Sequence, residues 1–268
     1  MDLSIIILNY NTAGLVTNCL KAIKELNLPY SYEILVIDNN SSDQSIKSLK
    51  DKFFGTKLIE APVNLGFSGG NNLGLAKAQG KYILIVNPDI LILSPAVEIM
   101  YQFMENHPLA GIVAPKLLNP DGSLQYSSSR WPDWRLPIYR RTFLGQTKSG
   151  KKWTDYYLMK DWDHRTDKKV DWLYGACLLV RKQAIKEVGR LDERYFMYME
   201  DLDWCRRFWS KNWEVWYLAT AEVIHYHQRE SALGVGLKGF FKKSGRIHLL
   251  SWLKYYLKWR GREYPRQS

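Results

Sequence analysis

Short, wholly apolar runs alternate with stretches of helical periodicity through the first half of the chain. Residues 4–8, 34–37 and 82–86 are continuous runs rich in Ile, Leu and Val, as expected of strands buried on both faces. Residues 15–26 repeat apolar side chains at helical spacing, and residues 69–79 form a second expected helix after a glycine-rich turn. This alternation predicts an α/β fold with a mostly parallel central sheet and helices on both faces.

The second half of the chain is less regular. Residues 121–171 are rich in Arg, Lys, Trp and Tyr and have poor periodicity, which predicts a long ordered loop region of the kind that sets substrate specificity. A basic, aromatic helix is expected from Phe240 onward. The remaining expected elements are strands over 57–60, 111–114, 172–180, 214–217 and 221–225, and helices over 95–106, 183–188 and 202–209.

Polar residues fall directly after three of the expected parallel strands. They are residues 9–11, residues 38–40 and residues 87–89. In open α/β sheets, ligands bind at the carboxyl ends of the strands. The three polar strand ends are therefore expected to meet at one binding site.

Composition and charge narrow the class of ligand. The chain has 268 residues, of which 46% are hydrophobic, so a sizeable core can form. The formal net charge of +11 points to an anionic partner, such as a phosphorylated substrate, a membrane surface or nucleic acid. Cys19, Cys177 and Cys205 have no metal-binding spacing and are interpreted as buried apolar residues.

Neither a signal peptide nor a membrane-spanning helix is expected. The first residues carry Asp2 and a short apolar run that suits a strand, and no apolar run approaches the 18 or so residues that a spanning helix needs. A cytoplasmic location is therefore expected, with peripheral contact at the inner face of the cell membrane.

Six motifs then occur in a fixed order along the chain. They are SIIILNYN, ILVIDNNSSD, NLGFSGGNNLG, NPD, GACLLVR and LDERYFMYMEDLDWCRR. In this order they resemble the family 2 inverting glycosyltransferases of GT-A type, and within them the rhamnosyltransferase-like branch of surface-polysaccharide enzymes. The resemblance covers roughly residues 3–230.

The resemblance implies a role for particular residues. It implies contacts with a nucleotide-diphosphate sugar, dTDP- or UDP-linked, by Asn9, Tyr10, Asn11, Asp38, Asn64, Gly66, Phe67, Asn71 and Asn87. It implies contacts with the acceptor by Trp172, Tyr174, Gly175 and Ala176. It also implies a divalent cation, Mg²⁺ or Mn²⁺, near Asp89 and His225, and an acidic pair, Glu200 and Asp201, in which Asp201 is the general base.

Physical reasoning leaves an alternative at each of these positions. Asp38 could be a turn cap, and the turn at Asn64 has neither the dinucleotide-binding nor the P-loop spacing. Asp89 could belong to a Pro-Asp turn, and Asn87 stands where the family's metal motif has its first acid. The acidic pair could simply favour a helix N-terminus.

The choice between neighbouring residues is also open. The ordinary carboxyl pKa of an aspartate, about 3.9, would leave Asp201 ionised at neutral pH and able to act as the base. Asp203 lies nearby and could replace Asp201 in this role. His227 could replace His225, and either could be structural; the residues after them, 228–230, depart from the family pattern. Trp172 to Ala176 could be a core strand.

The expected function is transfer of a sugar, with rhamnose as the candidate, to a saccharide or lipid-linked acceptor in surface-polysaccharide assembly. The expected organisation is a GT-A domain over 1–235, with a nucleotide-binding half over about 1–115, an acceptor-side half over 116–235, and a basic aromatic extension over 236–268. That extension suits an anionic membrane surface, or a helix packed on the domain.

Two other classes compete with a glycosyltransferase. A sugar nucleotidyltransferase would carry a glycine-rich loop with a phosphate-binding Lys near the first strand, which here ends in Asn9-Tyr10-Asn11. A basic nucleic-acid-binding protein would fit the charge and the tryptophans, but the ordered acidic residues would repel phosphates, so no nucleic-acid partner is expected.

Overall fold

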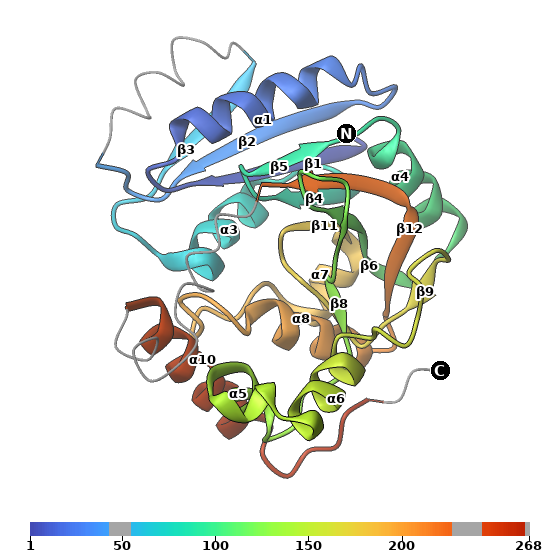
Figure 1. The fold of residues 1–268 in the computed structure, drawn as a ribbon. Helices are drawn as coiled ribbons and strands as arrows, with labels where there is room; N and C mark the ends of the chain where they lie inside the picture. The colour runs from blue at the N-terminus through green and yellow to red at the C-terminus, as the bar shows by residue number, and fades with distance from the viewer. Residues whose placement is uncertain (43–54, 227–242, 266–268) are drawn as a thin grey trace.

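The computed structural model describes residues 1–42, 55–226 and 243–265 (Figure 1). Within these residues a ten-stranded sheet runs in the order β3-β2-β1-β4-β11-β6-β12-β5, with β7 added on β6 and β9 on β12. The strands are β1 (Leu3–Asn9), β2 (Tyr32–Asp38), β3 (Thr56–Glu60), β4 (Tyr82–Val86), β5 (Ile90–Ile92), β6 (Ala110–Leu118), β7 (Leu124–Gln125), β9 (Lys168–Lys169), β11 (Cys177–Arg181) and β12 (Glu214–His225).

The first four strands of this order are parallel, as the pattern predicts. β3, β2, β1 and β4 all run in one direction, and β12 runs parallel to β6. β11 is antiparallel to both of its neighbours, β4 and β6, and so joins the two halves of the chain in one sheet. A separate two-stranded sheet is formed by β8 (Ser128–Ser129) and β10 (Trp172–Leu173).

Helices cover both faces of the main sheet (Figure 1). On one face, α1 (Ala13–Glu25) and α4 (Ala96–Asn106) contribute Val16, Leu20 and Met100 to a buried cluster with β1 and β4. On the other face lie α3 (Gly66–Lys77), α7 (Lys182–Val188) and α8 (Glu200–Trp209). The expected α/β class, with helices on both faces, is therefore confirmed.

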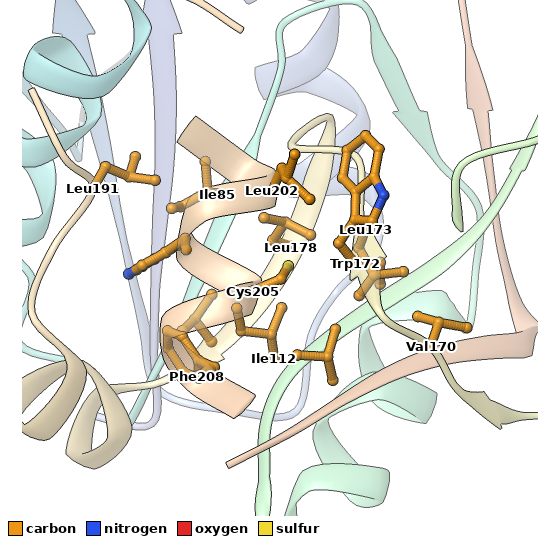
Figure 2. Close-up of a cluster of buried hydrophobic side chains, with 14 of the residues drawn as sticks. Ile85, Ile112, Val170, Trp172, Leu173, Leu178, Leu191, Leu202, Cys205 and Phe208 are labelled. Carbon is orange, nitrogen blue, oxygen red and sulfur yellow. The ribbon is translucent and has the colours of Figure 1, made fainter. Parts of the chain in front are cut away.

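Helix α8 is held against the sheet by a dense apolar cluster. Figure 2 shows Leu202, Cys205 and Phe208 of α8 in this cluster with Leu178 of β11 and Ile112 of β6. The three cysteines are free and buried, as interpreted from the sequence. Because α8 carries an apolar stripe at helical spacing, its packing fixes the position of the acidic residues at its first turn.

Four of the expected segments differ in the structure: the loop over 121–171 and the strands over 172–180, 214–217 and 221–225. The expected loop over 121–171 contains α5 (Leu136–Arg141), a 3₁₀ turn η1 (Phe143–Gln146) and α6 (Lys148–Tyr157), short helices whose periodicity is too brief to detect. The expected strand over 172–180 is two strands, β10 and β11, separated by a turn. Strands 214–217 and 221–225 are one strand, β12, interrupted by a bulge.

The C-terminal helix α10 (Lys243–Trp259) is docked on α8 through buried charges. Asp203 accepts hydrogen bonds from Lys258 Nζ at 2.8 Å and Trp259 Nε1 at 2.7 Å. The guanidinium of Arg206 lies 4.1 Å from the Trp259 ring and 4.2 Å from the Tyr264 ring. Residues 240–242 of the expected helix lie outside the described residues.

No helix in the described part of the chain is long and apolar enough to cross a membrane.

The expected division of the chain into a nucleotide-binding half, an acceptor-side half and a C-terminal extension, with boundaries near residues 115 and 235, stays a prediction.

Candidate active site

The ends of β1 and β2 are joined by a buried polar cluster. Asp38 Oδ1 accepts hydrogen bonds from Asn9 Nδ2 at 2.7 Å and Ser41 Oγ at 2.6 Å, and Asp38 Oδ2 accepts one from the Ser41 amide at 3.0 Å. The Asp38 side chain is buried together with that of Asn9. Asp38 therefore caps the turn that follows β2, and its predicted contact with the nucleotide stays a prediction.

The role of Asp38 in nucleotide binding can be separated from its role in the turn. We expect Asp38→Ala to weaken UDP or dTDP binding, measured by calorimetric titration, and also to reduce the free energy of unfolding by about 1–3 kcal/mol, because it leaves buried donors unpaired. Ser41→Ala removes one hydrogen bond to Asp38 but keeps the carboxylate. Equal loss of affinity in the two variants would mean that Asp38 acts only through the turn.

Asn39 links this cluster to the glycine-rich turn. Its Nδ2 donates to Asn64 Oδ1 and to the Gly66 carbonyl, both at 3.0 Å, and its Oδ1 accepts from the Leu65 amide at 2.9 Å. Gly66 has φ +71°, and a Cβ there would collide with the carbonyl oxygen of Phe196. Glycine is therefore required where this turn meets the segment that precedes α8.

The other predicted donor residues follow β1 and β4 or lie on α3. Tyr10 is 47% exposed, and Asn11, at φ +56°, accepts a hydrogen bond from the Ser42 amide at 2.8 Å. Asn71 is buried on α3, where its Nδ2 donates to the Phe67 carbonyl at 2.9 Å. Asn87 donates its amide to the Ala176 carbonyl at 2.9 Å, which connects the donor side to the acceptor side.

The predicted acceptor residues form the turn between β10 and β11. Trp172 is buried, donates Nε1 to the Arg130 carbonyl, and stacks on Tyr174 with ring centroids 4.9 Å apart. Tyr174 is only partly buried, so its ring is better placed than that of Trp172 to face a sugar. Gly175 approaches both Phe67 and Asp201 closely.

The acidic pair stands at the first turn of α8. Asp201 Oδ2 accepts a hydrogen bond from the Gly175 amide at 3.0 Å, and Oδ1 accepts from the Leu202 amide at 2.8 Å. The two residues before the pair, Tyr198 and Met199, have φ of +69° and +71°. Left-handed backbone is costly for residues with a Cβ, so packing of the surrounding segments must maintain this geometry.

Burial changes the acidity of both members of the pair. It raises the pKa of Asp201 to about 6, against the opposing effect of the Leu202 and Gly175 amides. Burial, and then the charge of Asp201, raises the pKa of Glu200 well above its ordinary value. The expectation of an ordinary pKa at Asp201 is therefore wrong, although its carboxylate still predominates at neutral pH.

Asp203 is engaged elsewhere. Its carboxylate is fully buried and accepts hydrogen bonds from Arg207 Nε at 2.9 Å and from Lys258 and Trp259 of α10. A carboxylate enclosed by these donors cannot reach an acceptor hydroxyl. Of the two aspartates, Asp201 is the one that could act as a base.

Asp89 and His225 face each other at the ends of neighbouring segments. Asp89 Oδ2 lies 3.3 Å from His225 Nε2, and His225 Nδ1 lies 2.8 Å from Gln125 Oε1. When Nδ1 donates to Gln125, Nε2 and the carboxylate present two acceptors to the same space. His227 lies outside the described residues.

This pair fits one side of a divalent-cation site. Asp89 Oδ1 is buried and has no hydrogen-bond partner in the described part of the chain, and a hydrogen-bonded Nδ1 is the usual support of a metal-binding imidazole. Among residues 1–42, 55–226 and 243–265, no group of three or more His, Cys, Asp or Glu side chains could hold a metal. A cation here would need further ligands from the diphosphate of the donor.

A cavity of about 580 Å³ adjoins the pair. Asp89 and His225 line it together with Leu15 and Asn18 of α1 and with Tyr226. Backbone contacts connect this cavity to the acidic pair. Asn87, two residues before Asp89, donates its amide to the Ala176 carbonyl, and the neighbouring Gly175 amide donates to Asp201.

Sequence reasoning gave no individual role to Asn39, Asn72 and Gln125, which organise the site. Asn72 of α3 donates to the Leu191 carbonyl and to Glu193, and so ties α3 to the segment before α8. Asn39 and Asn72 both stand beside predicted residues in polar motifs, which was a usable signal. Gln125 lies in the stretch without periodicity, where nothing in the sequence distinguishes it.

Known proteins resemble this chain in sequence and in fold. The family model described as Glycosyl transferase family 2 matches residues 4–189. The N-acetylglucosaminyl-diphospho-decaprenol L-rhamnosyltransferase of Mycobacterium tuberculosis is 29% identical over 204 residues, which are 72% of this chain and 66% of that enzyme. Rhamnosyltransferase WbbL of Escherichia coli is 27% identical over 244 residues, 88% of this chain and 86% of WbbL.

Solved structures share the fold at low identity. GalNAc-T7, solved with UDP, GalNAc and Mn²⁺, superposes with a TM-score of 0.66 at 15% identity, over 90% of this chain and 47% of that one. Residues 1–349 of S. aureus TarS superpose with a TM-score of 0.56 at 16% identity, over 84% of this chain and 60% of that one.

Proposed function

This chain belongs to glycosyl transferase family 2, and from that premise we propose that it catalyses an inverting transfer of a sugar to a lipid-linked saccharide acceptor. The enzyme is a glycosyltransferase of GT-A fold, and its relatives include rhamnosyltransferases. We propose rhamnose as the sugar and a dTDP- or UDP-linked donor. Family membership removes the nucleotidyltransferase and nucleic-acid-binding alternatives.

The observation that carries the proposal is the position and acidity of Asp201. Its carboxylate contacts the acceptor turn at Gly175, and its pKa is raised to about 6 by burial. A general base works best when its pKa lies near the working pH, because it is then ionised and still strongly proton-accepting.

We propose a single in-line displacement at this site. The acceptor hydroxyl attacks the anomeric carbon, Asp201 takes the hydroxyl proton, and the bond from that carbon to the diphosphate oxygen breaks. Asp89 and His225 would hold a divalent cation, Mg²⁺ or Mn²⁺, which neutralises charge on the leaving diphosphate when bound. The residues at the ends of β1 and β2 would bind the base and ribose of the donor.

The names of the relatives support a lipid-linked acceptor. The mycobacterial relative is named for a decaprenyl-diphosphate acceptor, and GT-A structures have been solved with UDP-GlcNAc and with GDP-Man and Mn²⁺. The present chain spans about two thirds of the length of that mycobacterial enzyme. A lipid-linked acceptor places the reaction at a membrane surface, and we propose peripheral association there.

A donor screen tests this function directly. With a prenyl-diphosphate N-acetylglucosamine acceptor, we expect dTDP-rhamnose to give the fastest nucleotide release among dTDP-, UDP- and GDP-sugars. The anomeric configuration of the product, read by NMR, should be opposite to that of the donor. A product of retained configuration, or release that does not depend on acceptor, would contradict the proposal.

A further inference from the structure

Helix α10 turns an apolar face outward. Leu249, Leu250, Leu253, Tyr256 and Leu257 are between 42% and 59% exposed. Their spacing, with steps of one, three and four residues, places all five on one side of a helix. We call these five residues the leucine face.

The side of α10 that faces the protein combines aromatic rings with polar groups. Tyr255 belongs to the buried core cluster, and Trp252 and Trp259 pack against that cluster. Ser251 Oγ donates to the Met197 carbonyl at 2.8 Å, and Lys258 Nζ lies 2.7 Å from Asp192 and from Asp203. A helix that packs one side on the core of a globular protein normally leaves polar residues on its other side, whereas α10 leaves the leucine face exposed.

Two lysines of α10 make polar contacts with the protein. The basic aromatic segment was expected to suit an anionic membrane surface or to pack on the domain. Lys258 forms ion pairs with Asp192 and Asp203, and Lys254 Nζ donates to the Arg194 carbonyl at 2.7 Å. The surface that α10 offers to a partner is therefore apolar at its centre.

Positive charge remains at the ends of the leucine face. Arg246 is exposed and, at 100° per residue, falls within the arc of the leucine face, and Arg260 is exposed in the turn directly after α10. The whole chain carries a net charge of +11. A second copy of the chain docked here would bring like charges together, whereas an anionic lipid surface would complement them.

A groove beside the leucine face adds interfacial aromatic residues. It encloses about 350 Å³ between residues 132–134 and α10, and Trp252, Tyr256, Arg260 and Arg262 line it. Trp134, on its other wall, is 65% exposed. Tryptophan and tyrosine are enriched at the level of lipid headgroups, because each has an apolar ring and a polar group.

Helix α10 contacts the segment that precedes the acidic pair. Phe196 and Met197, which are 37% and 36% exposed, belong to the segment that Ser251 of α10 contacts. The carbonyl of Phe196 accepts the Phe67 amide at 2.7 Å, and Glu200 follows three residues after Met197. A surface bound to the leucine face would therefore lie on the opposite side of α10 from this segment, about one helix diameter away.

We propose that the leucine face inserts into the headgroup region of an anionic bilayer and so presents the acceptor side of the enzyme to that bilayer. The role assigned to the acceptor rests on the proposed function; the docking itself does not. Insertion of the leucines supplies the apolar contact, and Arg246 and Arg260 bind the anionic headgroups.

Vesicle binding by a surface variant tests the docking. We expect Leu253→Ser combined with Leu257→Ser to lower the partition coefficient on phosphatidylglycerol–phosphatidylcholine vesicles by roughly tenfold or more, since two exposed leucines no longer enter the lipid. Leu109→Ser is the matched control, because Leu109 is 59% exposed, as Leu257 is, but lies outside α10. All three proteins should show the same unfolding temperature.

The outcomes of this experiment distinguish a bilayer from a second copy of the chain as the partner of the leucine face. The proposal is overturned if wild type does not bind the vesicles, or if the double variant binds as tightly as wild type. It is also overturned if wild type forms a dimer that the double variant abolishes, which would assign the leucine face to a second copy. Binding is measured without nucleotide or acceptor, so failure of the proposed transfer reaction would leave this result unaffected.

Discussion

Asp201→Asn is expected to lower turnover by about 10²–10⁴-fold while nucleotide binding stays near its wild-type value. The amide preserves the size of the side chain and can still accept the hydrogen bond from the Gly175 amide, but it cannot take a proton. The acceptor hydroxyl must then lose its proton to water as the bond forms. Turnover with saturating donor, together with calorimetric titration of the nucleotide, measures the two quantities separately.

The pH dependence of the same reaction gives a second measurement. Since the ionised form of Asp201 is the base and its pKa is about 6, kcat/KM should fall as the pH is lowered through 6. In Asp201→Asn this dependence should disappear. Glu200→Gln should cost less, because the carboxylate of Asp201 and its hydrogen bond from the Gly175 amide are kept.

Other outcomes would reassign the base. If Asp201→Asn keeps near-normal turnover and Glu200→Gln is inactive, Glu200 is the base. Asp203→Asn is expected to lower the unfolding temperature, because Arg207 and Lys258 lose their buried partner. If all three variants transfer sugar normally, the displacement mechanism proposed above is wrong.

Asp89→Ala is expected to reduce transfer by at least about 100-fold, and EDTA should inhibit the wild-type enzyme to a similar extent. A cation on a leaving diphosphate contributes several kcal/mol of transition-state stabilisation, and a tenfold loss in rate corresponds to about 1.4 kcal/mol. Because we propose that Asp89 and His225, whose side chains lie 3.3 Å apart, hold the cation, the variant should also bind Mn²⁺ with UDP more weakly.

A matched acid outside the pair controls for loss of charge. Asp121 lies in the exposed turn after β6, where it accepts hydrogen bonds from Ser123. Asp121→Ala should transfer sugar at the wild-type rate. Full activity of the wild type in EDTA would show that the diphosphate leaves without a metal, and His225 with nearby cations would then have to neutralise it.

Local pattern was sufficient for the fold class and for the positions of the polar strand ends. Apolar runs ending in Asn9, Asp38 and Asn87 predict parallel strands whose ends converge, because this follows from periodicity and from the geometry of parallel sheets. The first turn of α8 was recognised from its acidic residues. None of these inferences needed knowledge of which side chains are buried together.

Burial and long-range contacts explain what pattern could not provide. The raised pKa of Asp201 depends on the protein that encloses it, and the structural role of Asp203 depends on Lys258 and Trp259, more than 50 residues later. The outward direction of the leucine face depends in the same way on which side of α10 meets α8. The short helices over 121–171 are stabilised by packing more than by periodicity.

The contacts between α8 and α10 also bear on how the enzyme is synthesised. Asp203 and Arg206 are buried in the folded protein, yet their partners Lys258, Trp259 and Arg262 follow them by more than 50 residues in the chain. Until these partners are present, α8 carries charges that would be costly to bury. The final packing of α8 therefore has to wait until α10 has been synthesised, so the two helices are expected to become ordered together.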